Sequence, residues 1–134
     1  MGVTRLPNGL ETSDLTVSGS VALAGVLSGA VRQPVQELTA TGAITVTSGA
    51  ALLNHNSTVI AATKAAPTAG DVLFVINTSA SGTAAHTVTL PTGVTWDGTN
   101  RVATLNAPGE ALLAIAVSAT RFFVVANVGN VAFS

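Results

Sequence analysis

The chain has 134 residues, of which only 8% are charged and 48% are hydrophobic, and it contains no cysteine. Soluble domains usually carry about a quarter of their residues as charged side chains, because charge keeps their surfaces hydrated and apart. The net charge of −1 leaves no basic surface for nucleic acid, and the lack of cysteine excludes disulfides and thiolate metal sites. No span is long and apolar enough to cross a bilayer. From the charge and the lack of such a span, we expect neither a nucleic acid nor a membrane as partner. We expect other copies of the protein to cover much of the surface, so that function lies in assembly.

Two regions of different composition follow one another along the chain. Residues 1–14 contain a proline and an Asn-Gly pair but few large apolar groups, which predicts an extended arm with one turn. Residues 15–31 alternate small and apolar side chains with glycine, a pattern that favours thin strands packed closely against another backbone. Three glycines weigh against the competing prediction of a helix in this segment. We therefore divide the chain into an N-terminal region, residues 1–31, and one β domain, residues 32–134.

Short β-rich runs divided by turn residues make up the β domain, as expected of a sandwich or a barrel. We predict strands at residues 35–40, 43–47, 57–62, 71–77, 86–90, 101–105, 110–117, 121–127 and 131–133. Between them, Asp97 and Gly98 favour a hairpin turn, because both residue types tolerate positive φ. The Ala-Pro-Gly-Glu segment at 107–110 favours a type II turn with proline and glycine at its centre. The predicted fold class is all-β, an antiparallel β-sandwich or barrel with an extended N-terminal arm, assembled as a homotrimer.

The alternation of side chains indicates which strands meet water. In residues 86–90, the apolar side chains fall on one face, while Thr87 and Thr89 fall on the other and present hydroxyls to solvent. Residues 112–117 are apolar on both faces, so they need a second covering layer. A neighbouring subunit can supply that layer, and a central position within one sandwich explains the pattern equally well.

We assign the small-residue face of the last two long strands to a contact between subunits, because backbones can approach closely there. The predicted oligomer interface consists of Leu112, Ala114, Ala116, Phe122 and Val124. The chain also carries no charge from Leu38 to Thr63, although charged residues normally protect the edges of sheets from pairing with other strands. A closed homo-oligomer removes this hazard without charges.

The sequence offers little catalytic or metal-binding chemistry. Residues 25–29 approach the nucleophile-elbow pattern, but Leu27 occupies the middle position that must be serine. His55 and His86 have no second histidine or acid at a metal-ligand spacing, so both are interpreted as structural. We therefore predict no catalytic residue, no metal site, no cofactor and no enzymatic activity.

Trp96 is the only tryptophan of the chain, and two roles remain open for it. An exposed tryptophan can stack on sugars or bases, which would make it a ligand-binding residue. A tryptophan just before a turn, with Val94 two residues back on the same face, is more typical of a plug at one end of a core.

Several segments resemble small virion proteins of tailed phages. The opening residues 3–10, Val-Thr-Arg-Leu-Pro-Asn-Gly-Leu, resemble the N-terminal arm of such proteins. The C-terminal half resembles phage capsid decoration (cement) proteins and fibre-associated β proteins at residues 87–91, 96–100, 109–112 and 121–127. The family often has tryptophan after the arginine of the penultimate strand, where this chain has Phe122.

The resemblance implies a β-rich homotrimer on the exterior of a phage capsid, with extended arms running between major capsid subunits. The capsid-binding arm residues that it implies are Val3, Arg5, Leu6, Pro7, Asn8 and Leu10. We therefore expect a non-enzymatic structural protein of the virion that binds the major capsid protein and stabilises the shell. The alternative is a fibre or receptor-binding module that recognises a host surface glycan near Trp96.

Overall fold

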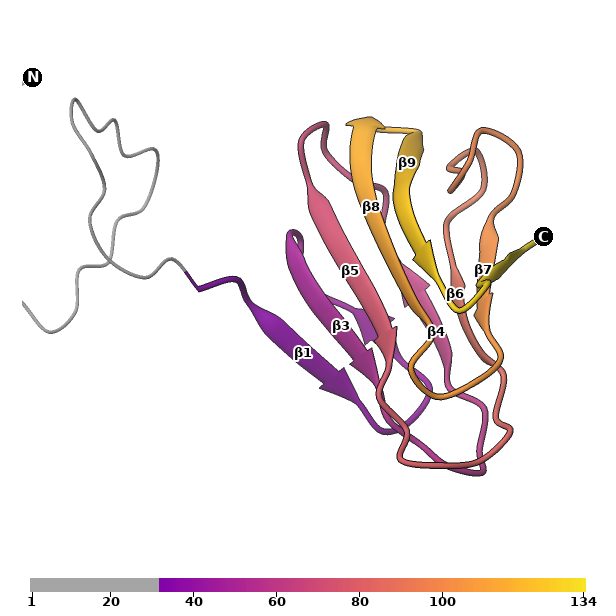
Figure 1. The fold of residues 1–134 in the computed structure, drawn as a ribbon. Helices are drawn as coiled ribbons and strands as arrows, with labels where there is room; N and C mark the ends of the chain where they lie inside the picture. Colours follow the sequence, from indigo (N-terminus) through magenta and orange to yellow (C-terminus); the bar gives the residue numbers. More distant parts are fainter. Residues whose placement is uncertain (1–31) are drawn as a thin grey trace, which may run out of the picture. The chain divides into compact units, whose positions relative to one another are not determined.

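The computed structural model describes residues 32–134, which form ten β-strands and no helix. The strands are β1 (Val35–Leu38), β2 (Ala43–Ile44), β3 (Gly49–Leu53), β4 (Ala61–Lys64), β5 (Val72–Asn77), β6 (His86–Thr89), β7 (Val102–Leu105), β8 (Ala111–Ser118), β9 (Arg121–Val128) and β10 (Ala132–Phe133). Sheet A has the order β1-β3-β5-β8-β9, and sheet B has the order β10-β7-β6-β4-β2. The two sheets stack as an open sandwich (Figure 1), which confirms the all-β prediction and decides between sandwich and barrel. The arm residues predicted within 1–31 lie outside the described residues.

The first six strands alternate between the two sheets along the chain. β1, β3 and β5 are parallel neighbours in sheet A, while β2, β4 and β6 are parallel neighbours in sheet B. Each connection in this half therefore crosses from one sheet to the other. Every second strand lies beside the previous strand of its own sheet and runs parallel to it. The prediction of an antiparallel sandwich is wrong for this half, because its turn residues mark crossings between sheets rather than hairpins.

The last four strands add antiparallel neighbours to both sheets. β7 pairs with β6 and β10 with β7 in sheet B, while β8 pairs with β5 and β9 with β8 in sheet A. Both sheets are consequently mixed. In sheet A, β8 lies between β5 and β9, with Phe74 opposite Leu113 and Ile115 opposite Phe123.

The core is built around two stacked aromatic rings. The ring centroids of Trp96 and Phe122 lie 5.1 Å apart with planes inclined by 28°, and both side chains are 0% exposed. Trp96 Nε1 donates a hydrogen bond to the Val88 carbonyl oxygen at 3.3 Å, so the polar group of the indole is satisfied inside the core. Large aliphatic side chains belong to the same buried cluster as the rings, among them Leu53, Ile60, Leu73, Leu90, Leu105 and Leu112. Trp96 is therefore a core residue, and its ring has no exposed face for stacking on a ligand.

Strand β3 is missing from the sequence prediction, because glycine and alanine are depleted in strands and the segment has no β-branched or aromatic residue. Its position between β1 and β5 overrides that preference. Gly49 has a φ of 141°, and a Cβ there would lie 2.2 Å from the Pro34 carbonyl oxygen. That oxygen accepts a hydrogen bond from Ala50 N at 2.9 Å, so glycine allows the chain before β1 to approach β3 closely.

Turn chemistry was the more reliable signal in the sequence. Gly109 has a φ of 84°, and Glu110 N donates to the Ala107 carbonyl oxygen at 3.2 Å, which confirms the type II turn. In the turn between β6 and β7, Asp97 Oδ1 accepts hydrogen bonds from Thr99 N at 2.8 Å and Asn100 N at 2.7 Å. These backbone donors, that of Asn100 foremost, hold the pKa of the Asp97 carboxyl below its usual range.

The residues predicted to form the oligomer interface face the interior of the sandwich. Leu112, Ala114, Ala116 and Phe122 are fully or almost fully buried, and Val124 packs against the same core. The small side chains of Ala114 and Ala116 leave room for the aromatic rings between the sheets, so close approach occurs within one chain rather than between chains. The assignment is corrected accordingly: the opposite face of β8 and β9 is the exposed one.

Ala116 and Val117 are neighbours on β8 that face opposite sides of sheet A, and they test this correction. Ala116→Glu buries a carboxylate without a partner, so we expect the unfolding free energy to fall by about 3 kcal/mol or more. On the single chain, Val117→Glu leaves the same charge in water, so at a dilution where the protein is monomeric we expect a loss of at most about 1 kcal/mol and an unchanged β-sheet circular dichroism spectrum. Urea unfolding measures both, and equal losses in the two variants would contradict the assignment.

Candidate assembly surface

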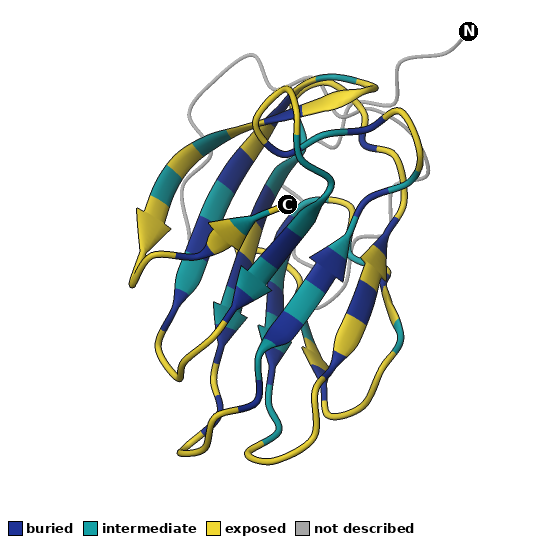
Figure 2. Cartoon of the chain, turned by 90° about the vertical axis from the view of Figure 1, so that its right-hand side faces the viewer, coloured by how far each residue is buried: buried dark blue, intermediate teal, exposed yellow. Residues whose placement is uncertain are grey.

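The outward side of sheet A is a continuous apolar surface. It is formed by Val72, Phe74, Ile76, Leu113, Ile115, Val117, Phe123 and Val125, and we call these residues the apolar face. Phe123 and Val117 are each 54% exposed, and Phe74 and Ile115 are each 38% exposed. Buried and exposed residues alternate along the strands (Figure 2), so each pair of neighbours sends one side chain inward and one outward.

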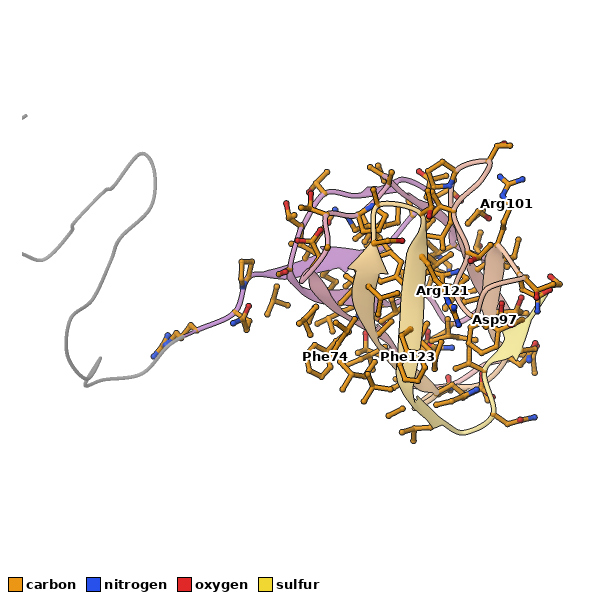
Figure 3. The ribbon with its side chains drawn as sticks, turned by 90° about the horizontal axis from the view of Figure 1, so that it is seen from above. Phe74, Asp97, Arg101, Arg121 and Phe123 are labelled. Carbon is orange, nitrogen blue, oxygen red and sulfur yellow. The ribbon has the colours of Figure 1, made fainter. Side chains whose placement is uncertain are left out.

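Strand register brings the exposed side chains together. Phe74 lies opposite Leu113, and Ile115 lies opposite Phe123, so two phenylalanines flank β8 from either side. Seen from above, Phe74 and Phe123 project from the same side of the sheet (Figure 3). Contiguous apolar surface of this kind is uncommon on monomeric proteins and marks interaction sites.

Charge is confined to the two edges of sheet A. The three central strands, β3, β5 and β8, contain no charged residue. On β1, Glu37 Oε1 accepts a hydrogen bond from Asn54 Nδ2 at 2.6 Å. On β9, an Nη atom of Arg121 donates to the Asp97 carbonyl oxygen at 3.4 Å. A partner that covers the middle of this sheet therefore meets no charge that it would have to neutralise.

Sheet B presents a different chemistry to solvent. Its outward positions on β4, β6 and β7 include Thr63, Thr87, Thr89 and Thr104, whose hydroxyls can bind water. The predicted alternation in residues 86–90 is confirmed, since Val88 and Leu90 are buried while Thr87 and Thr89 are partly exposed. One side of the sandwich is thus suited to water and the other to a partner.

The geometry of β9 favours contact through the face of sheet A rather than through its edge. β9 is an edge strand eight residues long, which would otherwise be open to pairing with another strand. Its register with β8 shifts between Leu113 and Ala114, leaving Val125 as an extra residue in a bulge. Bulges twist an edge and interrupt its hydrogen-bonding pattern, so strand addition along β9 is disfavoured.

The two histidines belong to a hydrogen-bond network with Ser79. Ile60 N donates to His86 Nδ1 at 3.0 Å, so the proton of the neutral ring lies on Nε2, which is 3.1 Å from Ser79 Oγ. Ser79 Oγ in turn donates to the His55 carbonyl oxygen at 3.1 Å and accepts from His55 N at 3.1 Å. His86 therefore has no free lone pair with which to accept the serine proton, and the network ties together the loops that follow β3 and β5.

Metal-binding groups do not gather in the described part of the chain. Residues 32–134 contain no group of three or more histidine, cysteine or acidic side chains that could hold a metal ion. His55 Nδ1 accepts hydrogen bonds from the amides of Ser57 and Thr58, which makes this histidine part of its own loop. Both histidines thus stabilise loop geometry.

His86 makes the stability of the fold depend on pH. Burial lowers the pKa of its ring, because the charged form loses hydration in the core. The unfolded chain, with an ordinary pKa near 6.5, then binds more protons than the folded chain as the pH falls below that value. We expect the unfolding free energy to be steady above about pH 6.5 and to decrease below it, by at most about 1.4 kcal/mol per pH unit from this group.

Urea unfolding between pH 8 and pH 5 measures this dependence. His86→Asn removes the titrating ring and should flatten the profile below pH 6.5. A slope that is the same in His86→Asn and in the original protein would show that other groups cause the dependence.

Comparisons with protein-family models, curated proteins and solved structures find no match for this chain. Within residues 32–134 there is no helix of the length and apolar character needed to span a membrane. The apolar face of sheet A is consequently the feature from which a function has to be inferred.

Proposed function

We propose that this chain is a non-enzymatic structural protein of a phage virion, which sits as a homotrimer on the exterior of the capsid and stabilises it. The single observation that carries the proposal is the apolar face of sheet A. Removing apolar surface from water stabilises a protein or complex by about 25 cal/mol per Å². Exposed residues such as Phe123 and Val117 provide this stabilisation only when a partner covers them. In this proposal the protein functions as an assembly, in which partners cover the apolar face that the single chain leaves exposed.

Other copies of the chain are the partners that best match this surface. A partner must bring a surface without charge, because a charge buried against β5 or β8 would find no opposite charge there. The apolar face of a second copy meets that requirement. Homo-oligomers of soluble proteins are usually closed and symmetric, which also prevents continued growth through the same face. The number three comes from the resemblance to capsid decoration proteins.

The capsid as the site of attachment rests on the same resemblance. The motif at residues 3–10 is similar to the arms of such proteins, which implies that Val3, Leu6 and Leu10 become buried when the arm binds. An extended segment can bind by adding its backbone to a strand of the major capsid protein. Three arms on one trimer would bind together, so that modest individual affinities add up to stable attachment.

Phe123→Glu tests the assembly surface directly. The substitution places a carboxylate in the middle of the apolar face, where covering it without a partner would cost several kcal/mol, so we expect the trimer to dissociate into folded monomers. Thr104→Glu adds the same charge to sheet B and serves as the matched control, which should keep the trimer mass. Light scattering at neutral pH measures both. A Phe123→Glu variant that keeps the mass and stability of the original oligomer would rule out this face as the contact.

Deletion of residues 1–14 tests the role of the arm. We expect the shortened protein to keep its β-sheet spectrum and oligomer mass but to lose binding to capsids, since the proposal places the attachment contacts in this segment. Co-sedimentation with undecorated phage capsids measures binding, with the full chain as the reference. Undiminished binding by the shortened protein would place the attachment in the β domain instead.

A further inference from the structure

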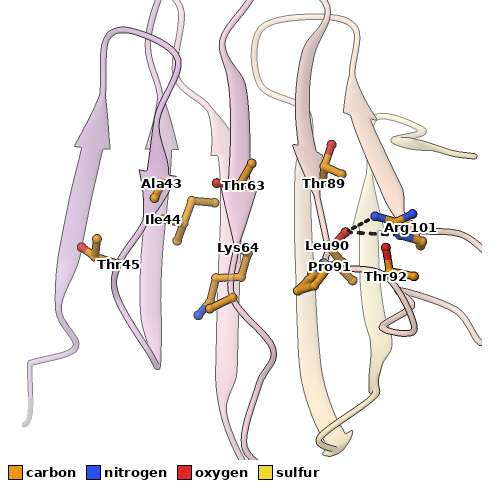
Figure 4. Close-up of a pocket in the computed structure, with 11 residues that line it drawn as sticks. Ala43, Ile44, Thr45, Thr63, Lys64, Thr89, Leu90, Pro91, Thr92 and Arg101 are labelled. Atoms are coloured by element: carbon orange, nitrogen blue, oxygen red, sulfur yellow. Dashed lines mark hydrogen bonds between the residues drawn. The ribbon is translucent and has the colours of Figure 1, made fainter.

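Sheet B carries a groove at the end where β2, β4 and β6 finish. The groove has a volume of about 600 Å³, which lies within the range of small-ligand sites in proteins. Strands β2 and β4 line one side, and the segment after β6 lines the other together with Arg101 (Figure 4). The apolar face belongs to sheet A, so a ligand in this groove would not compete with assembly through that face.

Two of the cationic side chains of the β domain, Lys64 and Arg101, line this groove at separate positions (Figure 4). Arg101 donates from Nε and from one Nη to the Leu90 carbonyl oxygen at 3.3 Å and 2.9 Å, which fixes the guanidinium at the rim (Figure 4). Its other Nη makes no hydrogen bond to the described residues. One edge of the guanidinium is therefore held by the protein, and the other remains free to bind an anion.

Lys64 is the more unusual of the two cations, because its side chain is only 5% exposed. Its Nζ has no hydrogen-bond partner among the described residues, yet none of their fully buried side-chain nitrogens or oxygens is left without a partner. The ammonium group therefore keeps contact with solvent, and the groove is the surface hollow that Lys64 lines. A cationic side chain that is so little exposed, and that has no hydrogen-bond partner among residues 32–134, gains from an anionic ligand.

The rest of the lining is neutral and amphipathic. No acidic residue lines the groove, so nothing within it opposes an anion. Thr45, Thr63, Thr89 and Thr92 contribute hydroxyls, which both donate and accept hydrogen bonds, together with methyl groups. The Pro91 ring adds apolar surface. This mixture of hydroxyl, methyl and cation matches a sugar acid, whose ring has hydroxyl edges, C–H faces and a carboxylate.

We propose that the groove binds an anionic saccharide, with carboxylates at Lys64 and at Arg101 and with hydroxyls against the threonines. A saccharide fits the groove better than an acidic peptide does. A peptide would need an open strand edge for its backbone, and β2, the edge strand beside the groove, has only two residues. The apolar side chains Ile44 and Leu90 are 3% and 1% exposed, so they offer no pocket for a peptide side chain.

Calorimetric titration with the trisaccharide of galacturonic acid tests the proposal on the full-length protein. We expect binding that weakens with added salt, as an electrostatic contact requires. The methyl-esterified trisaccharide lacks the carboxylate charge and should bind at least about tenfold more weakly, because it loses the charge-assisted hydrogen bonds. Backbone amide shifts of Thr63 and Thr89 in NMR spectra should report the site.

Two substitutions and one matched control test whether Lys64 and Arg101 bind the carboxylates. Lys64→Met keeps the aliphatic stem and removes the charge, Arg101→Gln removes the guanidinium, and each should weaken binding at least about tenfold. Arg121→Gln removes one positive charge on β9, outside the groove, and should leave the affinity unchanged. Thermal unfolding checks that each variant is folded. If Lys64→Met does not fold, the affinity of Arg101→Gln alone tests the proposed site.

Three results would overturn the proposal. The first is no binding of the trisaccharide at millimolar concentration. The second is binding that Arg101→Gln and Lys64→Met leave unchanged, which would place the ligand elsewhere. The third is tighter binding of a triglutamate peptide than of the trisaccharide, which would make the groove a site for acidic protein segments. None of these outcomes depends on whether the protein trimerises or binds a capsid.

Discussion

The stack of Trp96 on Phe122 is the contact on which the two faces of the sandwich depend. Trp96 lies in the turn region between β6 and β7 of sheet B, whereas Phe122 lies on β9 of sheet A. Backbone hydrogen bonds from Phe122 N to the Thr95 oxygen and from Thr95 N to the Thr120 oxygen join the two sheets beside the stack. With Phe122 held inward, the pleat of β9 turns Phe123 outward. The aromatic pair that closes the core therefore also determines that Phe123 lies in the apolar face.

The two exposed faces divide the chemistry of the molecule. The apolar face of sheet A has no charge in its three central strands, so it suits a partner as uncharged as itself. Sheet B carries threonines and a groove with two cations, which suits small hydrophilic ligands. A protein with so few charged residues can remain dispersed only if most of its apolar surface is covered, and self-assembly through one face leaves the hydroxylated face to water.

Strands and turns were largely predictable from the sequence, but their arrangement in space was not. Seven of the eight residues of β9, 121–127, and the type II turn at Gly109 follow from β-branched, aromatic and turn residues, whereas β3 contains no β-branched or aromatic residue. Alternation showed that β8 has two apolar faces, yet side-chain size alone could not decide which one meets the other sheet. The groove was missed because its residues come from separate strands. Its one signal was Lys64, which stands two residues after Ala62 on the inward side of β4.

The alternation of β1 to β6 between the sheets also governs how the chain can fold. In this half, two strands that are neighbours within a sheet are separated along the sequence by a strand of the other sheet. The pairings of Val35 with Ala50 and of Gly49 with Leu73 show this. Each such pairing requires the closure of a long loop before any contact is gained, which slows folding. The hairpin of β8 and β9 closes across Ser118 and Arg121 and can form early. The β8–β9 hairpin is therefore the expected folding nucleus, onto which the strands of the N-terminal half pack later.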